Sequence, residues 1–213
     1  QVKQKTGIEI EIINGNREAA YIYNGVKVSG CLSADNSLII DIGGGSVEFI
    51  ICNQEEIIWK QSFEIGAARL MDRFHNTDPI AAGSVKELQT YLDQVLAPLF
   101  EAARRINISR LIGSSGAFET FAEVMELEKG NAFDLKSIKH MEFELPHFIR
   151  LTTRLISSTH RERAATKGII PLRVDMIVVA SLITRHVLSQ LQINEVAMSM
   201  YSLKEGVLAE LLG

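Results

Sequence analysis

The sequence lacks the features that mark several large classes of protein. None of its apolar runs approaches the ~20 residues that a membrane-spanning helix needs, and no signal peptide is visible, so no membrane association is expected. Proline and tryptophan are scarce, with four and one. The two cysteines, Cys31 and Cys52, form neither a metal-ligand spacing nor a disulfide framework, which favours a reduced, cytoplasmic protein.

The chain also lacks a basic excess. Its formal net charge is −4, which argues against non-specific nucleic-acid binding, and no specific nucleic-acid partner is expected. The charge is uneven, however, because residues 150–186 carry seven lysines and arginines against two acids. This segment is either a solvated helical surface or a basic path for a polyanion. With 213 residues and 46% hydrophobic content, the chain can bury a proper core.

The strongest chemical signal lies in residues 38–51. Two short apolar runs flank Asp-Ile-Gly-Gly-Gly-Ser-Val-Glu, which predicts strand–turn–strand. Consecutive glycines can adopt positive φ and bring backbone N–H groups against an anion. No Gly-Lys-Ser/Thr follows, so this is not a Walker loop. The candidate phosphate-binding residues are Gly43, Gly44, Gly45 and Ser46.

Acids on both sides of these glycines distinguish the loop from an ordinary hairpin turn. A hairpin turn is the alternative interpretation of the glycines alone, but it needs neither Asp41 before them nor Glu48 after them. Carboxylates repel an anion, so Asp41 and Glu48 are expected to hold a metal cation or a water beside it.

A second junction of the same kind follows the expected strand 110–112. Small residues come directly before a helix that is expected to open at Ala117, and such a helix start leaves N–H groups free for an anion or a ribose hydroxyl. A plain strand-to-helix turn is the alternative. The candidate residues here are Gly113, Ser114, Ser115 and Gly116.

The first residues predict a helix end, a strand and a helix. Gly7 is expected to stop a helix, and the alternation in Ile8–Ile13 predicts a half-buried strand. Asn16 is the expected N-cap of a helix from Arg17 to about Lys27. Glu18 lies in its first turn, where a carboxylate is also favoured for purely structural reasons.

The remaining pattern predicts alternating strands and helices. Pro98 is expected to interrupt a helical run, and Thr159 with Glu162 forms a capping box. Strands are expected at 56–65 and 195–200, with a strand or short helix left open at 138–145. Helices are expected after Gly66, at 84–106, from Pro146, at 174–190 and after Tyr201.

Together these motifs resemble the exopolyphosphatase/guanosine pentaphosphate phosphohydrolase family of the actin-like ATPase superfamily. Residues 41–48 resemble its second phosphate loop, and residues 113–116 resemble the loop that faces it across the cleft. Residues 14–19 match the family's Ser/Asn-Gly-x-Glu-Glu-Ala segment. The match puts Glu18 in the place of the catalytic carboxylate and Arg17 where the first Glu usually stands.

Two later segments, residues 162–175 and 201–206, also resemble motifs of this family. The pattern Glu-Arg-x4-Gly-x4-Arg-x-Asp implies that Arg163 and Arg173 lie beside the phosphate cleft. From the residues alone, Arg173 and Asp175 could instead form a structural ion pair. Tyr-Ser-Leu-Lys-Glu-Gly departs from the family's Tyr-Gly-Leu-Arg-Glu-Gly at Ser202 and Lys204, and lysine lacks the bidentate fork of arginine.

The resemblance implies an α/β fold, a ribonuclease H-like (actin-like ATPase) domain with a mixed five-stranded sheet flanked by helices. Residues 1–213 would form one domain, the second half of a two-domain core whose first half, with its Asp-x-Gly-Ser-Asn-Ser loop, is absent from this chain. The implied partners are polyphosphate or a phosphorylated guanosine nucleotide and that missing N-terminal half. A homodimer stays open.

The activity implied is hydrolysis of a phosphoanhydride bond with Mg²⁺ or another divalent cation, releasing orthophosphate from polyphosphate or guanosine pentaphosphate. An isolated half is expected to bind weakly and turn over little. The alternatives are a non-catalytic polyphosphate or nucleotide sensor on the same fold, and an ATP-using kinase or chaperone-like half.

Overall fold

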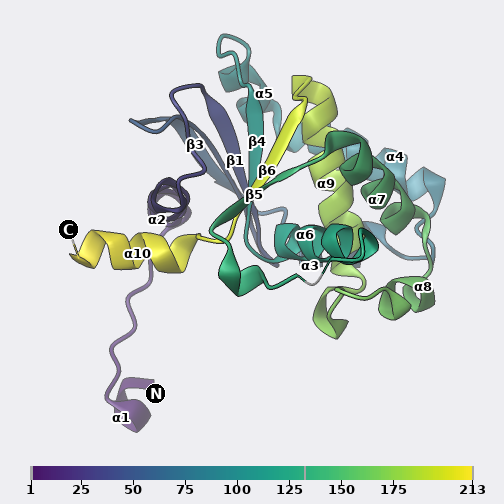
Figure 1. The fold of residues 1–213 in the computed structure, drawn as a ribbon, viewed down its shortest axis with the longest axis horizontal. Coiled ribbons are helices and arrows are strands. Elements are labelled where there is room, and N and C mark those ends of the chain that lie inside the picture. Colours follow the sequence, from purple (N-terminus) through teal and green to yellow (C-terminus); the bar gives the residue numbers. More distant parts are fainter. Residues whose placement is uncertain (1, 132, 213) are drawn as a thin grey trace.

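A mixed six-stranded sheet forms the centre of the molecule (Figure 1). The computed structural model describes residues 2–131 and 133–212. The strand order is β3-β2-β1-β4-β6-β5, with β1, β4 and β6 parallel and the other neighbours antiparallel. The strands are β1 Ser37–Ile42, β2 Val47–Cys52, β3 Ile57–Phe63, β4 Arg110–Ser114, β5 His140–Phe143 and β6 Glu195–Ser199.

Helices cover both faces of this sheet. Helix α2 lies on one face with α10 packed across it, whereas α3, α4, α6, α7 and α9 contribute to the core on the other face. The helices are α1 Val2–Thr6, α2 Gly15–Ser29, α3 Ala67–Phe74, α4 Ala82–Val95, α5 Ala97–Ala103, α6 Gly116–Glu128, α7 Leu145–Ser157, α8 His160–Ala165, α9 Met176–Leu191 and α10 Leu203–Leu212. Within the described residues, two 3-10 helices, η1 Leu135–Ser137 and η2 Pro171–Arg173, complete the elements.

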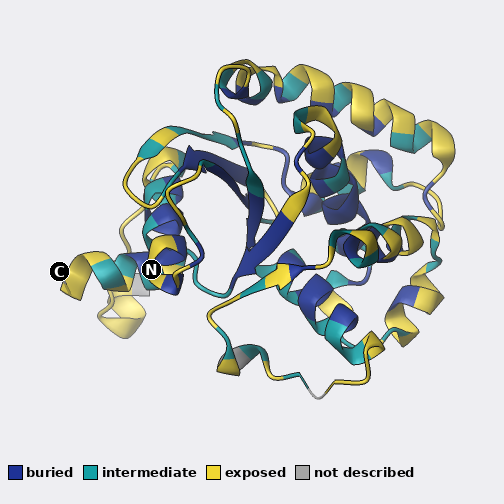
Figure 2. Ribbon diagram, turned by 45° about the horizontal axis from the view of Figure 1, so that its top comes forward, coloured by how far each residue is buried: buried dark blue, intermediate teal, exposed yellow. Residues whose placement is uncertain are grey.

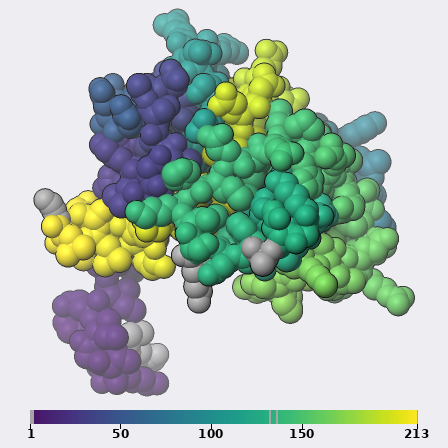
Figure 3. All heavy atoms as spheres, viewed as in Figure 1, coloured from purple at the N-terminus to yellow at the C-terminus, as the bar shows by residue number. Residues whose placement is uncertain are grey.

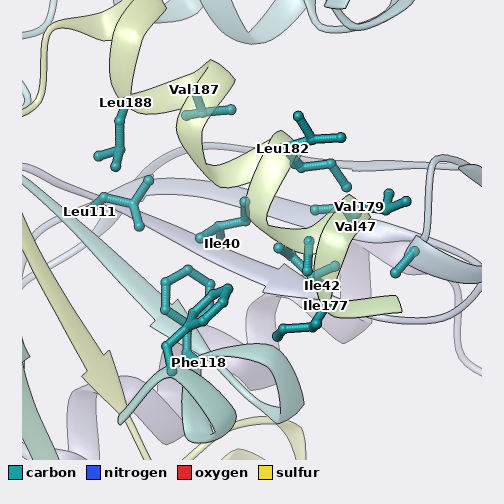
Figure 4. Close-up of a cluster of buried hydrophobic side chains, with 14 of the residues drawn as sticks. Ile40, Ile42, Val47, Leu111, Phe118, Ile177, Val179, Leu182, Val187 and Leu188 are labelled. Carbon is teal, nitrogen blue, oxygen red and sulfur yellow. The ribbon is translucent and has the colours of Figure 1, made fainter. Parts of the chain in front are cut away.

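Strand alternation divides the core between the two faces. Ile40 and Ile42 of β1 point with Val47 of β2 into the larger cluster, against α9 (Figure 4). Ile39 points the other way, toward α2. The sheet is buried along most of its length (Figure 2). Full burial of one large apolar side chain, such as Ile40, stabilises the fold by about 1.5–3 kcal/mol.

The predicted architecture is confirmed with one more strand than expected. The additional strand is β5, which falls in the segment 138–145 that the sequence left open between strand and short helix. The interruption at Pro98 is confirmed, because α4 ends at Val95 and α5 begins at Ala97. No helix in the described ranges is long and apolar enough to cross a membrane.

The expectations for the first residues are partly wrong. Gly7 ends α1 as expected, with φ +73° and its N–H donating to the Lys3 carbonyl oxygen at 2.9 Å. Ile8–Ile13 forms no strand, and the alternating Ile8, Ile10 and Ile12 are 62, 62 and 93% exposed. This segment projects away from the body (Figure 3), so no strand of the described chain pairs with it.

The N-cap of α2 is also two residues earlier than expected. Asn14, not Asn16, caps the helix, and its Oδ1 accepts a hydrogen bond from the Arg17 amide at 2.9 Å. The helix consequently begins at Gly15, which places Glu18 at the end of its first turn.

Helices α2 and α10 cross in backbone contact. A methyl group added at Gly206 would lie 1.7 Å from the Tyr21 carbonyl oxygen, and one at Gly25 would lie 2.0 Å from the Ser202 carbonyl oxygen. Only glycine allows this approach at either position. The crossing therefore joins α2 and α10 into one packing unit beside the sheet.

Candidate active site

Polar side chains form a row across one level of the sheet. The strand register places Asp41 of β1 opposite Glu48 of β2 and Ser114 of β4. The row continues to Ser62 of β3 and Ser199 of β6. Side chains two residues earlier or later on a strand share a face, and the adjoining positions on this face are the apolar Ile50, Ile39, Ile112 and Ala197. The apolar face thus changes to oxygen groups where β1 ends beside the glycine loop.

Asp41 is the centre of this row. Its side chain is buried, with the residue only 7% exposed, and its carboxylate accepts three serine hydroxyl groups. Ser115 donates to Oδ1 at 2.5 Å, and Ser114 and Ser202 donate to Oδ2 at 3.1 and 2.7 Å. Burial raises the pKa of Asp41, and the three hydroxyl donors act in the opposite direction. These donors stabilise a carboxylate that would otherwise be costly to bury.

Ser115 is held in an unusual backbone conformation at this position. Its φ of 58° and ψ of −174° lie in a region that is essentially restricted to glycine and costs about 1–3 kcal/mol. The strained residue is the N-cap of α6, yet its side chain makes no capping hydrogen bond and turns to Asp41 instead. The strained backbone of Ser115 therefore accompanies the hydrogen bond to Asp41 and not a cap of α6.

Glu48 and Glu18 add two more carboxylates. Glu48 is 2% exposed and accepts the Ser62 hydroxyl at 2.6 Å. Burial raises its pKa, the hydroxyl groups of Ser62 and Ser46 oppose this, and the charges of Glu18 and Asp41 add to it. The pKa of Glu18 is raised first by burial and then by the charge of Asp41. The three carboxylates are thus close enough to repel one another, which favours a cation or a proton among them.

The glycine loop offers backbone donors next to these acids. Gly44 and Gly45 are exposed and Ser46 is half-buried. Among the described residues, no protein group accepts from the amides of Gly44, Gly45 and Ser46, whereas Gly43 donates to the Ser46 carbonyl oxygen at 3.0 Å. Three successive unpaired amides can bind an anion.

The loop glycines do not adopt the backbone conformation that was expected of them. None of Gly43, Gly44 and Gly45 adopts positive φ. The loop instead packs against the start of α3, where a methyl group at Gly66 would lie 2.4 Å from the backbone of Gly44 and Gly45. The amides of Gly66, Ala67 and Ala68 donate to the loop carbonyl oxygens at 2.8–3.1 Å, which turns the loop's carbonyl groups toward α3.

Arg69 lies on this helix beside the loop. A methyl group at Gly45 would lie 3.8 Å from its Nε, and its guanidinium pairs with Glu64 at 2.6 Å on the exposed surface. Arg69 is thus a basic side chain next to the glycine loop.

The second loop is shaped chiefly by packing. Gly113 and Ser114 belong to strand β4, and a methyl group at Gly113 would lie 2.0 Å from the ring of Phe118. Gly116 opens α6, and a methyl group there would lie 3.0 Å from the Arg173 guanidinium. Of the four predicted residues, Ser114 and Ser115 meet the site directly through Asp41, while Gly113 makes room for the core.

The two predicted phosphate-binding arginines have different surroundings. Arg173 is half-buried beside Gly116 and pairs with Glu119 at 3.1 Å. The expected structural pair between Arg173 and Asp175 is therefore wrong, because Glu119 is the partner of Arg173. The position of Arg173 at the start of α6 keeps it next to the Ser115 side of the site.

Arg163 is a structural residue. It is 1% exposed, and its guanidinium donates to the carbonyl oxygens of Val174 and Ser158 and pairs with Asp78 and Asp175 at 3.2 and 2.9 Å. These acceptors occupy all three nitrogens, so the phosphate contact expected for Arg163 is inconsistent with this arrangement. Sequence pattern could not separate the two arginines, since both occupy motif positions.

Other arginines of 150–186 are likewise used in packing. Arg154 pairs with Glu128, and Arg185 donates to the Ile149 carbonyl oxygen and to Thr153 at 3.2 and 2.8 Å. These contacts join α7 to its neighbours, so Arg154 and Arg185 serve neither of the two interpretations given for the segment, a solvated helical surface or a basic path.

The donor set fits a hard divalent cation only in part. Within residues 2–131 and 133–212, no group of three or more His, Cys, Asp or Glu side chains is placed to hold a metal ion. Asp41 and Glu48 supply carboxylate oxygens, and Mg²⁺ commonly binds through one or two carboxylates with substrate phosphates and water completing its shell. The site therefore fits Mg²⁺ in a shared arrangement and not in a closed protein cage.

A cavity of about 580 Å³ adjoins the serine side of the site. It lies between the start of α6 and α10, with Ser115 and Ser202 on its wall. The rest of the lining is mostly apolar, with acidic groups and one lysine: Met200, Leu203, Val207, Leu208, Glu119, Glu205 and Lys204. Lys204 itself pairs with Glu205 at 3.0 Å.

Three residues of the site were not predicted. Ser62 and Ser202 belong to it through Glu48 and Asp41, and Arg69 through the glycine loop. The sequence held a signal for Ser202, because this residue departs from the resembled motif. It also held one for Arg69, which closely follows Gly66, the residue that precedes α3. Ser62 carries no local signal, since only the register of β2 and β3 places it opposite Glu48.

Comparison with known proteins identifies related chains. A model described as the Ppx/GppA phosphatase family matches residues 1–213. The chain is 24% identical over 211 residues to exopolyphosphatase 2 of Mycobacterium tuberculosis, covering 97% of this chain and 65% of that protein. It is 25% identical over 215 residues to a guanosine-5'-triphosphate,3'-diphosphate pyrophosphatase of Photobacterium profundum, covering 100% of this chain and 41% of that protein. The chain thus spans less than two thirds of either relative.

Solved structures show the same fold. The structure superposes with a TM-score of 0.95 on an exopolyphosphatase from Cytophaga hutchinsonii, at 45% identity over 99% of this chain and 68% of that one. The TM-score is 0.83 for a PPX-GPPA enzyme of Aquifex aeolicus, at 21% identity over 98% of this chain and 68% of that one. The expected ribonuclease H-like, actin-like ATPase fold is confirmed.

Proposed function

Because the chain belongs to the Ppx/GppA phosphatase family, we propose that its protein hydrolyses phosphoanhydride bonds and releases orthophosphate from inorganic polyphosphate or guanosine pentaphosphate. The observation that carries the proposal is that the unpaired amides of Gly44–Ser46 lie beside the carboxylates of Asp41 and Glu48. Backbone donors suit the phosphoryl oxygens, and carboxylates suit the water and cation that hydrolysis requires.

The glycine loop binds the terminal phosphoryl group. The amides of Gly44, Gly45 and Ser46 donate to its oxygens, and the Ser46 hydroxyl adds a donor when it turns from Glu48 to the substrate. Arg69 supplies positive charge next to Gly45, and Arg173 supplies it next to Gly116. These groups are fixed before the substrate arrives, so little reorganisation is needed as charge develops in the transition state.

Glu18 orients and deprotonates the attacking water. Its pKa is raised by burial and by the Asp41 charge, and a raised carboxylate pKa makes a stronger base near neutral pH. The proton of the water passes to the Glu18 carboxylate as the water oxygen attacks phosphorus. The phosphoanhydride oxygen then leaves with the shortened chain.

Asp41 and Glu48 would hold Mg²⁺, or another divalent cation, through their carboxylates. The cation supplies neutralisation of the phosphoryl charge when bound. The serine hydroxyls around Asp41 favour the ionised carboxylate and so oppose the effect of burial on its pKa.

The cavity beside Ser115 and Ser202 favours a nucleoside as a second kind of substrate. Its volume of about 580 Å³ and its apolar wall at Met200, Leu203 and Val207 can take a purine base, while linear polyphosphate has no apolar part to place there. Guanosine pentaphosphate is therefore included with polyphosphate as a substrate.

The catalytic cleft also needs the N-terminal half of the same protein. The chain spans 65% of exopolyphosphatase 2, and one loop with its acids encloses only one side of a phosphate. The isolated chain accordingly binds substrate weakly and turns it over little. A homodimer remains a second arrangement to test by mass measurement in solution.

We infer a cytoplasmic location, because two free cysteines without a disulfide fit a reducing compartment. Cys31 and Cys52 are free and buried, and burial raises their thiol pKa values to about 11 and 12. Such thiols are unreactive and persist without oxidation.

The test is orthophosphate release from polyphosphate and from guanosine pentaphosphate by the full-length protein and its Glu18→Gln variant. Loss of the base is expected to lower kcat by about 10²–10⁴-fold, the usual contribution of general base catalysis. The amide keeps the size of the carboxylate, so the melting temperature should stay close to that of the wild type.

Equal phosphate release by both proteins would exclude Glu18 as the base. If the wild-type protein binds polyphosphate in an equilibrium titration but releases no phosphate with Mg²⁺ present, the non-catalytic sensor is the correct interpretation. A Ser189→Ala variant, on the exposed side of α9, serves as the matched control.

A further inference from the structure

Ser202 connects the C-terminal helix to the site. It lies between β6 and α10, and its hydroxyl donates to Asp41 Oδ2 at 2.7 Å. The other two donors to this carboxylate, Ser114 and Ser115, come from β4 and the start of α6, at 3.1 and 2.5 Å. Among the described residues, Ser202 is thus the hydroxyl donor that reaches Asp41 from the α10 side of the sheet.

The Ser202 hydroxyl donates to Asp41 and therefore does not cap α10, the helix that Ser202 precedes. Ser202-Leu203-Lys204-Glu205 has the spacing of a capping box, and half of the box is formed, with the Ser202 amide donating to Glu205 Oε2 at 3.0 Å. In a complete box the serine hydroxyl would accept from the Glu205 amide. Here the side chain is turned to Asp41.

The same motif elsewhere in this chain shows the difference. At α8, Thr159 and Glu162 form both hydrogen bonds of the box, at 3.3 and 2.7 Å. A cap hydrogen bond contributes about 1 kcal/mol to helix stability. The diverted hydroxyl at α10 therefore indicates a role that helix capping does not explain.

Helix α10 is in turn locked to the helix that carries Glu18. The Gly206–Tyr21 and Gly25–Ser202 backbone contacts leave no room for even a methyl group between α2 and α10. One of these contacts is at the Ser202 carbonyl group itself. Ser202 thus touches α2 through its backbone and Asp41 through its side chain.

We propose that Ser202 is a positioning residue, whose hydroxyl fixes Asp41 of β1 relative to the α2–α10 pair and thereby sets the geometry between Asp41 and Glu18 during hydrolysis. This inference rests on the function proposed above. A displacement of about 1 Å between reacting groups can cost about 10²-fold in rate. The hydrogen bond from Ser202 to Asp41 therefore controls turnover.

The experiment compares Ser202→Ala, Ser202→Thr and Glu205→Ala in the full-length protein. Steady-state kcat and KM for polyphosphate are measured together with the melting temperature. Ser202→Ala is expected to lower kcat about 10-fold or more with KM changed less than about 2-fold. The substitution removes the hydrogen bond between Ser202 and Asp41 and leaves the phosphate loop unaltered. Ser202→Thr keeps the hydroxyl and is expected to restore most of kcat.

Glu205→Ala removes the formed half of the cap without touching Asp41. It is expected to lower the melting temperature more than Ser202→Ala does. Its kcat for polyphosphate, which does not occupy the proposed nucleoside cavity that Glu205 lines, should stay within about 2-fold of the wild type. If Ser202→Ala and Glu205→Ala both lower the melting temperature with unchanged kcat, Ser202 is a capping residue and the inference is wrong. Failure of Ser202→Thr to restore kcat contradicts it as well.

The Glu18→Gln variant separates this inference from the proposed function. If Glu18→Gln loses activity and Ser202→Ala keeps wild-type kcat, only the positioning role is wrong. If the wild-type protein releases no phosphate, the proposed function fails and the positioning role fails with it.

Discussion

Gly113 and Gly44 both belong to candidate phosphate loops, yet their surroundings give them different reasons to be glycine. A methyl group at Gly113 would meet the fully buried ring of Phe118 at 2.0 Å, whereas at Gly44 the nearest atom, on Ala68, is 3.9 Å away. Neither residue adopts positive φ. The first glycine is therefore required by the core, and the second is free to serve a ligand.

Alanine at these two positions should separate stability from binding. Gly113→Ala is expected to destabilise the protein by about 1–3 kcal/mol, the usual cost of overpacking, measured as a lower urea midpoint. Gly44→Ala should keep the wild-type midpoint and weaken orthophosphate binding, measured by calorimetry on the full-length protein. A Gly113→Ala protein with unchanged stability would contradict the packing argument.

Arg17 shows how a departure from a motif can have a local cause. It stands beside Glu18, where the resembled family usually has an acid, and the sequence alone could not say what the change does. Its guanidinium pairs with Glu11 at 2.5 Å and its Nε donates to the Tyr21 hydroxyl at 3.0 Å. The extra charge is thus held by the segment before α2 and by the next turn of the helix.

At the scale of elements, Arg163 organises the segments that lead into α9. It joins the loop at Asp78, the end of α7 and the start of α9 at Asp175. Asp78 also accepts the His160 amide, at 2.8 and 2.7 Å to its two oxygens. This amide donation, together with Arg163, holds the pKa of Asp78 below its ordinary value.

The stabilisation from Asp78 should consequently depend on pH in a known direction. A folded-state pKa below the unfolded value of about 3.9 means that stability is present above that pH and is lost as pH falls through the folded pKa. The unfolding midpoints of the wild type and Asp78→Asn should differ most at pH 7 and converge below about pH 3.9. A difference that persists unchanged at low pH would mean that the charge is not its source.

The order of elements could be predicted because local patterns determine them. The capping box at Thr159, the break at Pro98 and the glycine stop at Gly7 depend on residues close in sequence, and all three are confirmed. The candidate acids Asp41 and Glu48 were found because they flank an unusual glycine run. Ser62 and Ser202 could not be found in this way, since strand register and helix crossing bring them to the site across 14 and 161 residues.

The failed expectations have a tertiary cause of the same kind. Asn14 and Asn16 are both good caps, and only the position at which the chain enters α2 decides between them. Arg163 and Arg173 have similar motif positions, but Arg163 is enclosed by Asp78 and Asp175, whereas Arg173 is half-buried beside Gly116 and pairs with Glu119. Periodicity predicts which residues alternate in Ile8–Ile13, yet a strand also requires a neighbouring strand to pair with.

On the scale of the whole molecule, the segment before α2 leaves alternate isoleucines exposed. Ile8, Ile10 and Ile12 alternate with polar residues in an extended segment that leaves the body (Figure 3), and they are mostly exposed. Isolated exposed isoleucines are ordinary, but a two-residue repeat is the pattern of a strand with one buried face. This chain spans 68% of the Cytophaga hutchinsonii exopolyphosphatase, so the N-terminal half that we propose as a partner can supply that face.

Amide hydrogen exchange can test this pairing directly. In the isolated chain, the amides of residues 8–13 should exchange at nearly the rate of an unstructured peptide, because no strand of the described chain protects them. In the full-length protein, those that join a sheet should slow by at least about 10²-fold, while the amides of β1 should be protected in both. Replacing Ile10 with Thr keeps strand propensity but removes apolar burial, and should reduce the new protection without changing that of β1. Equal, fast exchange of residues 8–13 in both proteins would show that the exposed isoleucines do not form a strand with the N-terminal half, and that the two halves meet through other surfaces.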